Sequence, residues 1–364
     1  MKIAILGSRG IPNAYGGFEQ YAEQLSRFLA DRGCEVYVYC SSAHPYKASK
    51  LGKVYLKHQY DPEWLGTTGQ FVYDYNCIKD ARKENFDIIY QLGYTSSAIF
   101  NRMMPAQAKL ITNMDGMEWQ RSKYSPMVQR FLKWSESLVI RSSHYLIADA
   151  VPIQEYIRKQ YNTEAYYSAY TSIIPANADE SLLEPYSLVK KQYSLLIARM
   201  EPENNIEPVL EAYAATAQQY PLIVIGNTDN HFGRYLLKKF AQPNIRFLGS
   251  IYDKPILDTL RQCSAFYFHG HSVGGTNPSL LEAMASKCSI IAHDNVYNRS
   301  VLQEHALFFA TANELKDILL NINQQDHFYE KANTYNVATI EKQYSEAAVF
   351  EPLYHFFQSV LKSE

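Results

Sequence analysis

The loop and helix start around residues 270–285 carry the residue types best suited to binding an anion. A predicted strand ends at His269, the pair Gly274-Gly275 permits an unusual backbone path, and Asn277-Pro278 begins a helix with proline at a first-turn position that it tolerates. A helix N-terminus presents unpaired N–H groups and the positive end of its dipole to an anion. We therefore expect a phosphate at this loop, with Glu282 accepting hydrogen bonds from a sugar hydroxyl beside it.

The start of this helix can be interpreted in two ways. If Asn277 is the N-cap, Glu282 lies at the fifth helical position, beyond the reach of a capping box. If Ser279 is the N-cap, Ser-Leu-Leu-Glu is itself a capping box and Glu282 has a structural role. His269 and His271 are also ambiguous, because loop histidines often have structural partners, but their place at a strand end beside two glycines favours a ligand site.

A second glycine-rich loop follows the first predicted strand and extends to Gly17. Its spacing is not Gly-x-Gly-x-x-Gly, and the second strand ends in Cys40-Ser41-Ser42, where a dinucleotide site requires an acidic residue for the ribose. The loop therefore does not favour NAD binding. Gly16 and Gly17 still allow a ligand to approach the next helix start closely, so we expect them to form a wall of the ligand-binding cleft. The alternative is an ordinary turn.

Asp115 and Glu118 follow the predicted strand 109–113 and should therefore lie at the carboxyl edge of a sheet. A carboxylate there can orient or deprotonate a substrate hydroxyl, and we favour Asp115 over Glu118 as that base. The structural alternative is a carboxylate that caps the next loop. Beyond them, residues 119–134 interleave basic and aromatic side chains, which fits either contact with an anionic membrane surface or a solvated amphipathic helix.

Short apolar runs alternate with helical patterns along the chain, as buried parallel strands with crossover helices require. In the first half the predicted strands are 2–6, 35–40, 86–91, 109–113 and 144–148, and the helices are 18–32, 96–103, 127–143 and 151–161. After a break at 175–191 the strands are 194–198, 222–225, 245–248, 265–269 and 289–292, and the helices are 207–217, 232–240, 255–262 and 278–286.

This pattern predicts an α/β protein with two Rossmann-like, doubly wound parallel-sheet domains that face a central cleft. We expect residues 1–180 to form an N-terminal domain and residues 190–340 a C-terminal domain. The amphipathic segment 341–364 is expected to be a helix that packs back on the N-terminal domain.

Composition excludes several classes of protein. With 35 Lys and Arg against 37 Asp and Glu, the net charge of −2 argues against a nucleic-acid partner held by a basic surface. The five cysteines include no Cys-x-x-Cys pair, so neither a disulfide framework nor a zinc knuckle is expected. There is no signal-peptide pattern and no apolar run of about 18 residues, so we expect a cytoplasmic protein, or one peripheral on the inner face of the cell membrane.

Together these motifs resemble glycosyltransferase family 4, the retaining sugar transferases with the GT-B fold, and most of all its bacterial rhamnosyltransferase-like branch. The similarity extends over nearly the whole chain and rests on the segments 7–12, 16–19, 115–119, 199–205 and 274–282. The resemblance implies that Glu282 binds the ribose of a nucleotide-sugar donor and that Arg199 binds its phosphate. It further implies that Thr276 and Asn277, next to Gly275, offer backbone N–H groups to the diphosphate.

The same resemblance suggests dTDP-rhamnose as the donor, a saccharide or lipid-linked acceptor, and a role in surface polysaccharide biosynthesis. Two positions depart from the family pattern. Asn204 replaces the lysine that follows the phosphate-binding arginine, and Gly274 replaces the first glutamate of Glu-x7-Glu. These changes indicate either a divergent branch or impaired catalysis, and the intact flanking motif favours divergence.

The sequence contains no Asp-x-Asp triplet of the kind that holds a metal in many sugar transferases. We therefore expect Arg199 and the helix start at Asn277 to offset the charge of the leaving diphosphate, with no metal and no cofactor. The predicted activity is that of a hexosyltransferase. The rival interpretations are a nucleotide-sugar epimerase of the same architecture and a catalytically degenerate, sugar-nucleotide-binding partner of an active transferase.

Overall fold

The computed structural model describes residues 1–14, 16–216, 218–322 and 326–362, and the chain divides into two compact units. Unit 1 comprises Met1–Gln120, Tyr124–Tyr170 and the segment that begins at Glu346. Unit 2 comprises Arg121–Lys123 and Thr171–Ser345. The boundary expected at residues 180–190 is therefore too late, because the chain already belongs to unit 2 at Thr171. The assignment of Arg121–Lys123 to unit 2 was not expected.

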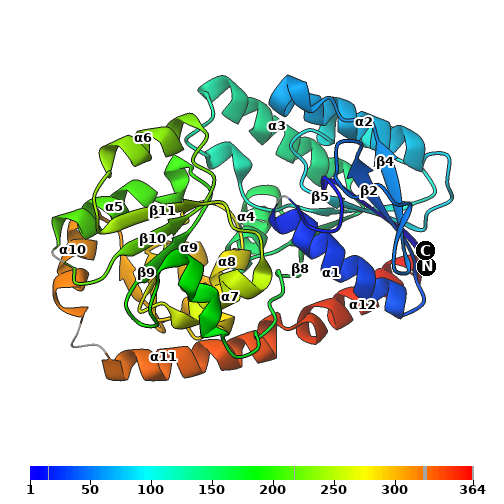
Figure 1. Ribbon diagram of the computed structural model, residues 1–364. Coiled ribbons are helices and arrows are strands. Elements are labelled where there is room, and N and C mark those ends of the chain that lie inside the picture. The colour runs from blue at the N-terminus through cyan, green and yellow to red at the C-terminus, as the bar shows by residue number, and fades with distance from the viewer. Residues whose placement is uncertain (15, 217, 323–325, 363–364) are drawn as a thin grey trace. The chain divides into compact units, whose positions relative to one another are not determined.

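In unit 1 the described strands form an eight-stranded sheet in the order β3-β4-β2-β1-β5-β6-β7-β8 (Figure 1). These strands are β1 (Lys2–Leu6), β2 (Glu35–Ser41), β3 (Lys50–Leu51), β4 (Val54–Gln59), β5 (Ile88–Leu92), β6 (Lys109–Asn113), β7 (Tyr145–Ala148) and β8 (Tyr166–Tyr167). Neighbours pair in parallel except β3 and β4. Ile3 in the centre is fully buried and lies opposite Val36 and Ile88. Such burial follows from helices covering both faces of a parallel sheet.

The helices of unit 1 include one from the C-terminal end of the chain. They are α1 (Gly17–Asp31), α2 (Gly69–Ala81), α3 (Pro126–Ser142), α4 (Val151–Tyr161) and α12 (Glu346–Lys362), with short 3-10 helices η1 (Glu63–Thr68), η2 (Ala98–Met103) and η3 (Glu118–Gln120). Helix α12 lies beside α1 (Figure 1). The ring of Phe350 packs 5.6 Å from that of Tyr21. Phe357 packs 5.4 Å from Tyr90. The C-terminal helix thus belongs to unit 1, but it begins only after a π-helical turn, Ile340–Tyr344, in unit 2.

In unit 2 the described strands form a six-stranded parallel sheet in the order β11-β10-β9-β12-β13-β14. These strands are β9 (Ser194–Ile197), β10 (Leu222–Ile225), β11 (Ile245–Gly249), β12 (Tyr267–His269), β13 (Ile290–His293) and β14 (Leu307–Phe309). The helices are α5 (Ile206–Ala215), α6 (His231–Lys239), α7 (Lys254–Cys263), α8 (Pro278–Ala285), α9 (Val296–Leu302), α10 (Ala312–Leu320) and α11 (Asp326–Thr339), with 3-10 helices η4 (Glu180–Tyr186) and η5 (Pro202–Asn204).

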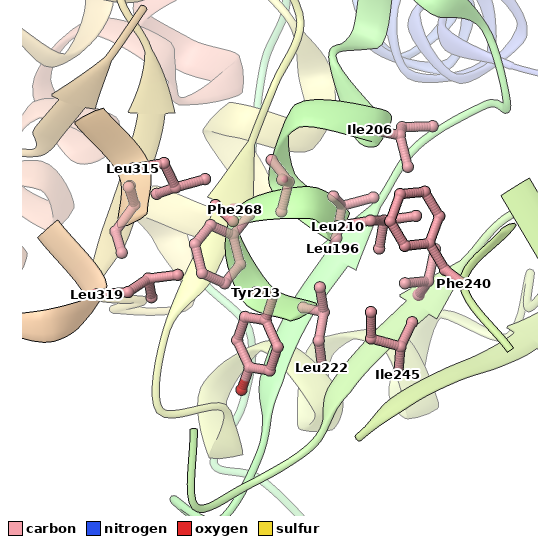
Figure 2. Packing of buried hydrophobic residues seen from close by; sticks show 14 of the residues in the cluster. Leu196, Ile206, Leu210, Tyr213, Leu222, Phe240, Ile245, Phe268, Leu315 and Leu319 are labelled. Atoms are coloured by element: carbon pink, nitrogen blue, oxygen red, sulfur yellow. The ribbon is translucent and has the colours of Figure 1, made fainter. Parts of the chain in front are cut away.

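The core of unit 2 gathers side chains from β9, β10, β12, α5 and α10 around Phe268 (Figure 2). The ring of Tyr213 in α5 meets that of Phe268 edge-on, with centroids 6.1 Å apart. Leu315 and Leu319 of α10 close the same cluster. Because Phe268 precedes His269 at the end of β12, this packing fixes the strand from which the candidate anion loop departs.

Every strand predicted from the sequence is present, with ends displaced by at most two residues. The segment predicted as a helix at 96–103 is instead the 3-10 helix η2. Four described strands, β3, β4, β8 and β14, and four described α-helices, α2, α9, α10 and α11, were not predicted. The additional strands lie at sheet edges or next to them, so they enlarge the two sheets without changing their parallel centres.

Candidate active site

The predicted anion loop leads from the end of β12 into α8. Asn277 is the N-cap of α8, because its side-chain oxygen accepts a hydrogen bond from the backbone N–H of Ser279 at 2.9 Å and Pro278 occupies the first turn. Ser279 is not the cap, since its hydroxyl lies 2.6 Å from the hydroxyl of Tyr267. The first interpretation of the sequence is therefore correct, and the N-terminus of α8, with the positive end of its dipole, opens on this loop.

Gly274 shapes the loop through its backbone conformation. Its φ is 125°, a region that favours glycine, whereas a Cβ at this position would meet no atom within 4 Å. Glycine is thus needed for conformation and not for space. Gly275 and the buried Thr276 complete the path into α8. The loop, together with Tyr297 and Asn298, borders a hollow of about 180 Å³ that is open to solvent.

His269 and His271 stack on each other, with ring centroids 4.5 Å apart. His269 is 1% exposed, and neither of its ring nitrogens has a hydrogen-bond partner among the described residues. Burial, and then the nearby His293, lowers the pKa of His269 to about 3. Burial, followed by His269, Arg199 and Arg121, also holds the pKa of His271 well below its usual value. Both imidazoles are therefore neutral near pH 7, and His271, which borders the hollow, offers a polar contact without charge.

Arg199 lies in the turn that follows β9, with an exposed side chain. Asn204, which stands where the resemblance expects a lysine, is 3% exposed and donates from Nδ2 to the carbonyl of Arg199 at 2.8 Å. Its amide thus fixes the backbone that presents the arginine. Asn205, with a φ of 46°, donates to the carbonyl of Gly270 at 2.8 Å. A Cβ on Gly270 would come within 2.1 Å of the Asn204 carbonyl oxygen, so the two loops pack backbone against backbone.

A buried ion pair between Arg121 and Glu203 lies next to the loop that carries Ser272. The guanidinium of Arg121 lies 3.4 Å from a carboxylate oxygen of Glu203, and their side chains are 11% and 2% exposed. The carbonyl of Glu203 accepts hydrogen bonds from both the backbone N–H and the hydroxyl of Ser272, at 3.1 and 2.8 Å. Ser272 borders the hollow. Neither Arg121 nor Glu203 was selected from the sequence, because their pairing joins positions 82 residues apart.

Glu282 is held by an arginine that sequence reasoning also missed. Its carboxylate pairs with the guanidinium of Arg261 in α7 at 2.5 Å, and the Arg261 side chain is 3% exposed. This pair keeps a carboxylate on the first turns of α8, consistent with a polar role, but its contact with a ribose stays a prediction. In the described part of the chain, no three His, Cys, Asp or Glu side chains are arranged to hold a metal ion.

In unit 1 the second glycine loop ends at the start of α1. Gly16 is the N-cap residue in extended backbone, and Gly17 is the first residue of the helix. The carboxylate of Glu19 accepts a hydrogen bond from the backbone N–H of Arg9 at 2.7 Å. Glu19 is 4% exposed, and this burial raises its pKa. A side chain at Gly16 would approach Glu19 at 3.5 Å. The two glycines therefore lie at a helix N-terminus as predicted, while their contact with a donor stays a prediction.

Asp115 follows β6 and has a left-handed φ of 49°, which is uncommon for a residue with a side chain. Its backbone N–H donates to the side chain of Asn113 at 3.0 Å. Asp115 borders a hollow of about 170 Å³ in unit 1, together with Tyr94, Glu136 and Tyr156. Glu118, in η3, is not among the described residues that border it. The structure thus places Asp115, and not Glu118, at the border of this small hollow.

The basic and aromatic segment 119–134 is only partly exposed. Trp119 and Lys133 turn inward and bind the buried carboxylate of Glu136, each at 2.9 Å. Met127 and Trp134 of α3 are 81% and 50% exposed. The alternating pattern therefore combines an internal polar network with an apolar surface. Of the helices that the structure describes, none is long and apolar enough to cross a bilayer.

The comparison with known families decides the class of the protein. Residues 183–335, most of unit 2, match the family described as Glycosyl transferases group 1. The chain is a glycosyltransferase. Residues 1–173 match a Domain of unknown function (DUF1972). Among curated protein sequences, none matches this glycosyltransferase significantly.

Several solved structures share the fold of this glycosyltransferase. Sucrose-phosphate synthase from Thermosynechococcus elongatus is 15% identical, with 100% of both chains covered and a TM-score of 0.84. Anabaena HepE in complex with UDP-glucose is 12% identical, with 98% of this chain and 99% of that chain covered and a TM-score of 0.75. Trehalose 6-phosphate synthase from Burkholderia multivorans is 11% identical, with 100% and 99% covered and a TM-score of 0.72. At such identities the likeness establishes the fold.

The predicted fold class and enzyme class are therefore confirmed. The glycosyltransferase has two Rossmann-like parallel-sheet domains of the GT-B type. Its placement in family 4 and in the rhamnosyltransferase-like branch stays a prediction.

Proposed function

We propose that this glycosyltransferase moves a hexose, rhamnose from dTDP-rhamnose in the first instance, to a hydroxyl of a saccharide or lipid-linked acceptor during assembly of a surface polysaccharide. The observation that carries the proposal is the glycine loop that opens on the capped N-terminus of α8 within a group 1 domain. The presence of UDP-glucose in the HepE structure supports a pyrimidine nucleoside diphosphate sugar as the class of donor. The choice of rhamnose rests on the sequence resemblance alone.

The donor diphosphate gains negative charge as the glycosidic bond breaks, and that charge must be offset. In unit 2 the exposed Arg199 and the N-terminus of α8 are suited to this task. A unit charge 4 Å away is worth about 4 kcal/mol at an effective dielectric constant near 20, and a helix terminus adds roughly 0.3 to 2 kcal/mol. We infer that these groups support departure of the diphosphate without a metal, and that the anomeric configuration is retained.

The acceptor hydroxyl is assigned to unit 1, where Asp115 borders the hollow formed with Tyr94 and Tyr156. A carboxylate in this position can orient the hydroxyl and accept its proton, while the tyrosine rings offer surfaces for a sugar ring. Replacing Asp115 with Asn keeps its shape and removes its basicity. We therefore expect Asp115→Asn to lower turnover much more than donor affinity, and unchanged turnover would remove Asp115 from the mechanism.

An assay with a panel of nucleotide sugars, dTDP-rhamnose and UDP-glucose included, tests the proposal. Each donor is incubated with and without a lipid-linked acceptor, and in EDTA or in magnesium. Sugar transfer that requires the acceptor and persists in EDTA supports the proposal. An isomerised donor formed without acceptor would identify an epimerase, and donor binding without any turnover would identify a non-catalytic partner protein.

We further propose that the enzyme works at the inner face of the cell membrane. The support is the exposure of large apolar side chains in two elements of unit 1, Trp64 and Leu65 in η1 and Met127 and Trp134 in α3. Helix α3 also carries the exposed Arg130. Aromatic and basic side chains together suit the interface of an anionic bilayer. Co-sedimentation with phosphatidylglycerol vesicles at low salt tests this, and protein that stays in the supernatant would contradict it.

A further inference from the structure

The carboxylate of Glu136, in α3, is the centre of a buried hydrogen-bond network in unit 1. Its side chain is 2% exposed. Five donors from four different parts of the chain bind its two oxygens: Tyr94 at 3.3 Å, Trp119 at 2.9 Å, Lys133 at 2.9 Å, Tyr156 at 2.7 Å and Tyr161 at 2.6 Å. Burying a carboxylate is costly unless its oxygens are hydrogen-bonded and it is paired with a cation. Glu136 meets both conditions.

The cation of this network, the partly exposed Lys133, lies against three aromatic rings. The ammonium of Lys133 lies 4.5 Å from the ring of Trp119, 4.7 Å from that of Tyr156 and 5.3 Å from that of Tyr161. Burial, and then the bond to Glu136, raises the pKa of Tyr161, as expected for a phenol that donates to an ionised carboxylate. The network therefore joins α3 to Tyr94, to η3 and to α4.

One of the five donors comes from the segment that carries the candidate base. We call residues 114–119 the Asp115 loop. At its first residues the backbone N–H of Asp115 is bound by Asn113 at 3.0 Å, and at its end Trp119 is bound by Glu136. The left-handed φ of Asp115 is unfavourable for a residue with a side chain, so it persists only where the surroundings hold the backbone.

We propose that Glu136 is a positioning residue that fixes the Asp115 loop through Trp119, so that the Asp115 carboxylate faces the hollow that Glu136, Tyr94 and Tyr156 also border. This inference rests on the role proposed above for Asp115. Glu136 acts on the conformation of the base and is not itself assigned to the reaction.

The chain offers a matched pair of variants to test this role. Trp119→Phe and Tyr161→Phe each remove one N–H or O–H donor to Glu136 and keep an aromatic ring beside Lys133, but only Trp119 belongs to the Asp115 loop. We expect Trp119→Phe to lower kcat about 10- to 100-fold with donor KM changed less than about threefold, since a small misplacement of a catalytic group costs this much. Tyr161→Phe should keep kcat within about threefold, because the loop contact persists.

Amide hydrogen exchange reports loop order independently of turnover. We expect faster exchange at residues 115–119 in Trp119→Phe than in Tyr161→Phe, at matched thermal stability. Equal losses of kcat in the two variants, or unchanged exchange of the loop in Trp119→Phe, would overturn the positioning role. Glu136→Gln should show both effects of Trp119→Phe, and if it does not fold the two aromatic variants still decide the question.

The same measurements separate this inference from the proposed function. If Asp115→Asn retains full turnover while Trp119→Phe still loosens residues 115–119, Glu136 anchors the loop and the assignment of Asp115 as base is wrong. If Asp115→Asn abolishes turnover while Trp119→Phe leaves both the loop and kcat unchanged, Asp115 is the base and the positioning role of Glu136 is wrong.

Discussion

At the scale of single residues, the candidate donor site depends on polar groups whose protonation and pairing differ from their ordinary behaviour. Asn204 illustrates this. The resemblance treats it as a missing lysine, whereas the structure uses its amide to hold the carbonyl of Arg199. The departure from the family pattern is therefore accompanied by a local compensation, in which the backbone that presents the arginine gains a hydrogen bond.

Restoring the family residue should consequently do harm. In Asn204→Lys the hydrogen bond to Arg199 is lost and an ammonium is placed at a 3% exposed position, so we expect the free energy of unfolding to fall by about 1–3 kcal/mol. Urea denaturation measures this change. The control is Asn204→Ala, which loses the same hydrogen bond without adding a charge. A more active and equally stable Asn204→Lys enzyme would show that the position can still serve as a phosphate ligand.

His269 should make the stability of the protein depend on pH. Its pKa of about 3 in the folded chain lies below the ordinary value of 6.5. Between these two pH values the imidazole is therefore protonated in the unfolded chain and neutral in the folded chain. The stabilisation is complete above pH 6.5 and is lost as pH falls toward 3, by about 1.4 kcal/mol per pH unit for one proton. His269→Phe keeps a ring of similar shape and breaks no hydrogen bond among the described residues.

The difference between the two proteins isolates this proton from the other titrating groups. As pH falls from 6.5 to 4, the unfolding free energy of His269→Phe should rise steadily relative to that of the wild type. Urea denaturation at a series of pH values measures this difference. A constant difference in unfolding free energy across this range would mean that His269 is protonated in the folded chain.

At the scale of elements, the N-terminus of α8 combines a structural and a chemical role, and substitutions at Asn277 separate them. Asp and Ser are both good N-caps, so Asn277→Asp and Asn277→Ser should keep the unfolding free energy within about 0.5 kcal/mol. Only Asp adds a negative charge where the diphosphate is proposed to bind. We expect Asn277→Asp to raise the donor KM at least about fivefold, given about 1 kcal/mol or more between unit charges 4 Å apart.

Initial-rate kinetics with a fixed acceptor concentration measures this effect, and Asn277→Ser is the uncharged control. The same donor KM in both variants would place the diphosphate elsewhere.

Most of the strands and helices could be predicted, because the short apolar runs at the sheet centres indicate buried parallel strands. The bounds of β1, β6, β10 and α4 agree with the sequence prediction at both ends. Helix α2 was missed because it begins at Gly69, a poor helix former, and its N-cap Thr68 makes no side-chain capping bond. Strand β4 was missed because its alternating Val-Tyr-Leu-Lys-His-Gln lies near a sheet edge and is only half apolar.

The candidate site was predictable only where a motif is local. The loop at 274–277 is contained in a few consecutive residues, so glycine and capping chemistry identify it. Glu136, Arg261 and Glu203 were missed because each acquires its role from partners 17, 21 and 82 residues away, on other elements. Single-sequence patterns carry no information about such pairings.

At the scale of the whole molecule, α12 completes the core of unit 1. Phe350 is fully buried against Tyr21 and Phe28, so Phe350→Ala should lower the free energy of unfolding by about 3–5 kcal/mol. His355→Ala, on the exposed side of the same helix, should change it by less than about 0.5 kcal/mol. Thermal and urea unfolding measure the stability of the two variants. Equal unfolding free energies of Phe350→Ala and His355→Ala would mean that Phe350 contributes little to the core of unit 1.

The division of the chain also determines how it can be taken apart. The chain passes from one unit to the other four times, at 120–121, 123–124, 170–171 and 345–346. A recombinant fragment 1–170 would therefore present the aromatic rings of Tyr21 and Tyr90 to water and is expected to aggregate. Isolating unit 1 therefore calls for a circular permutation that joins the C-terminal helix directly to the first strand.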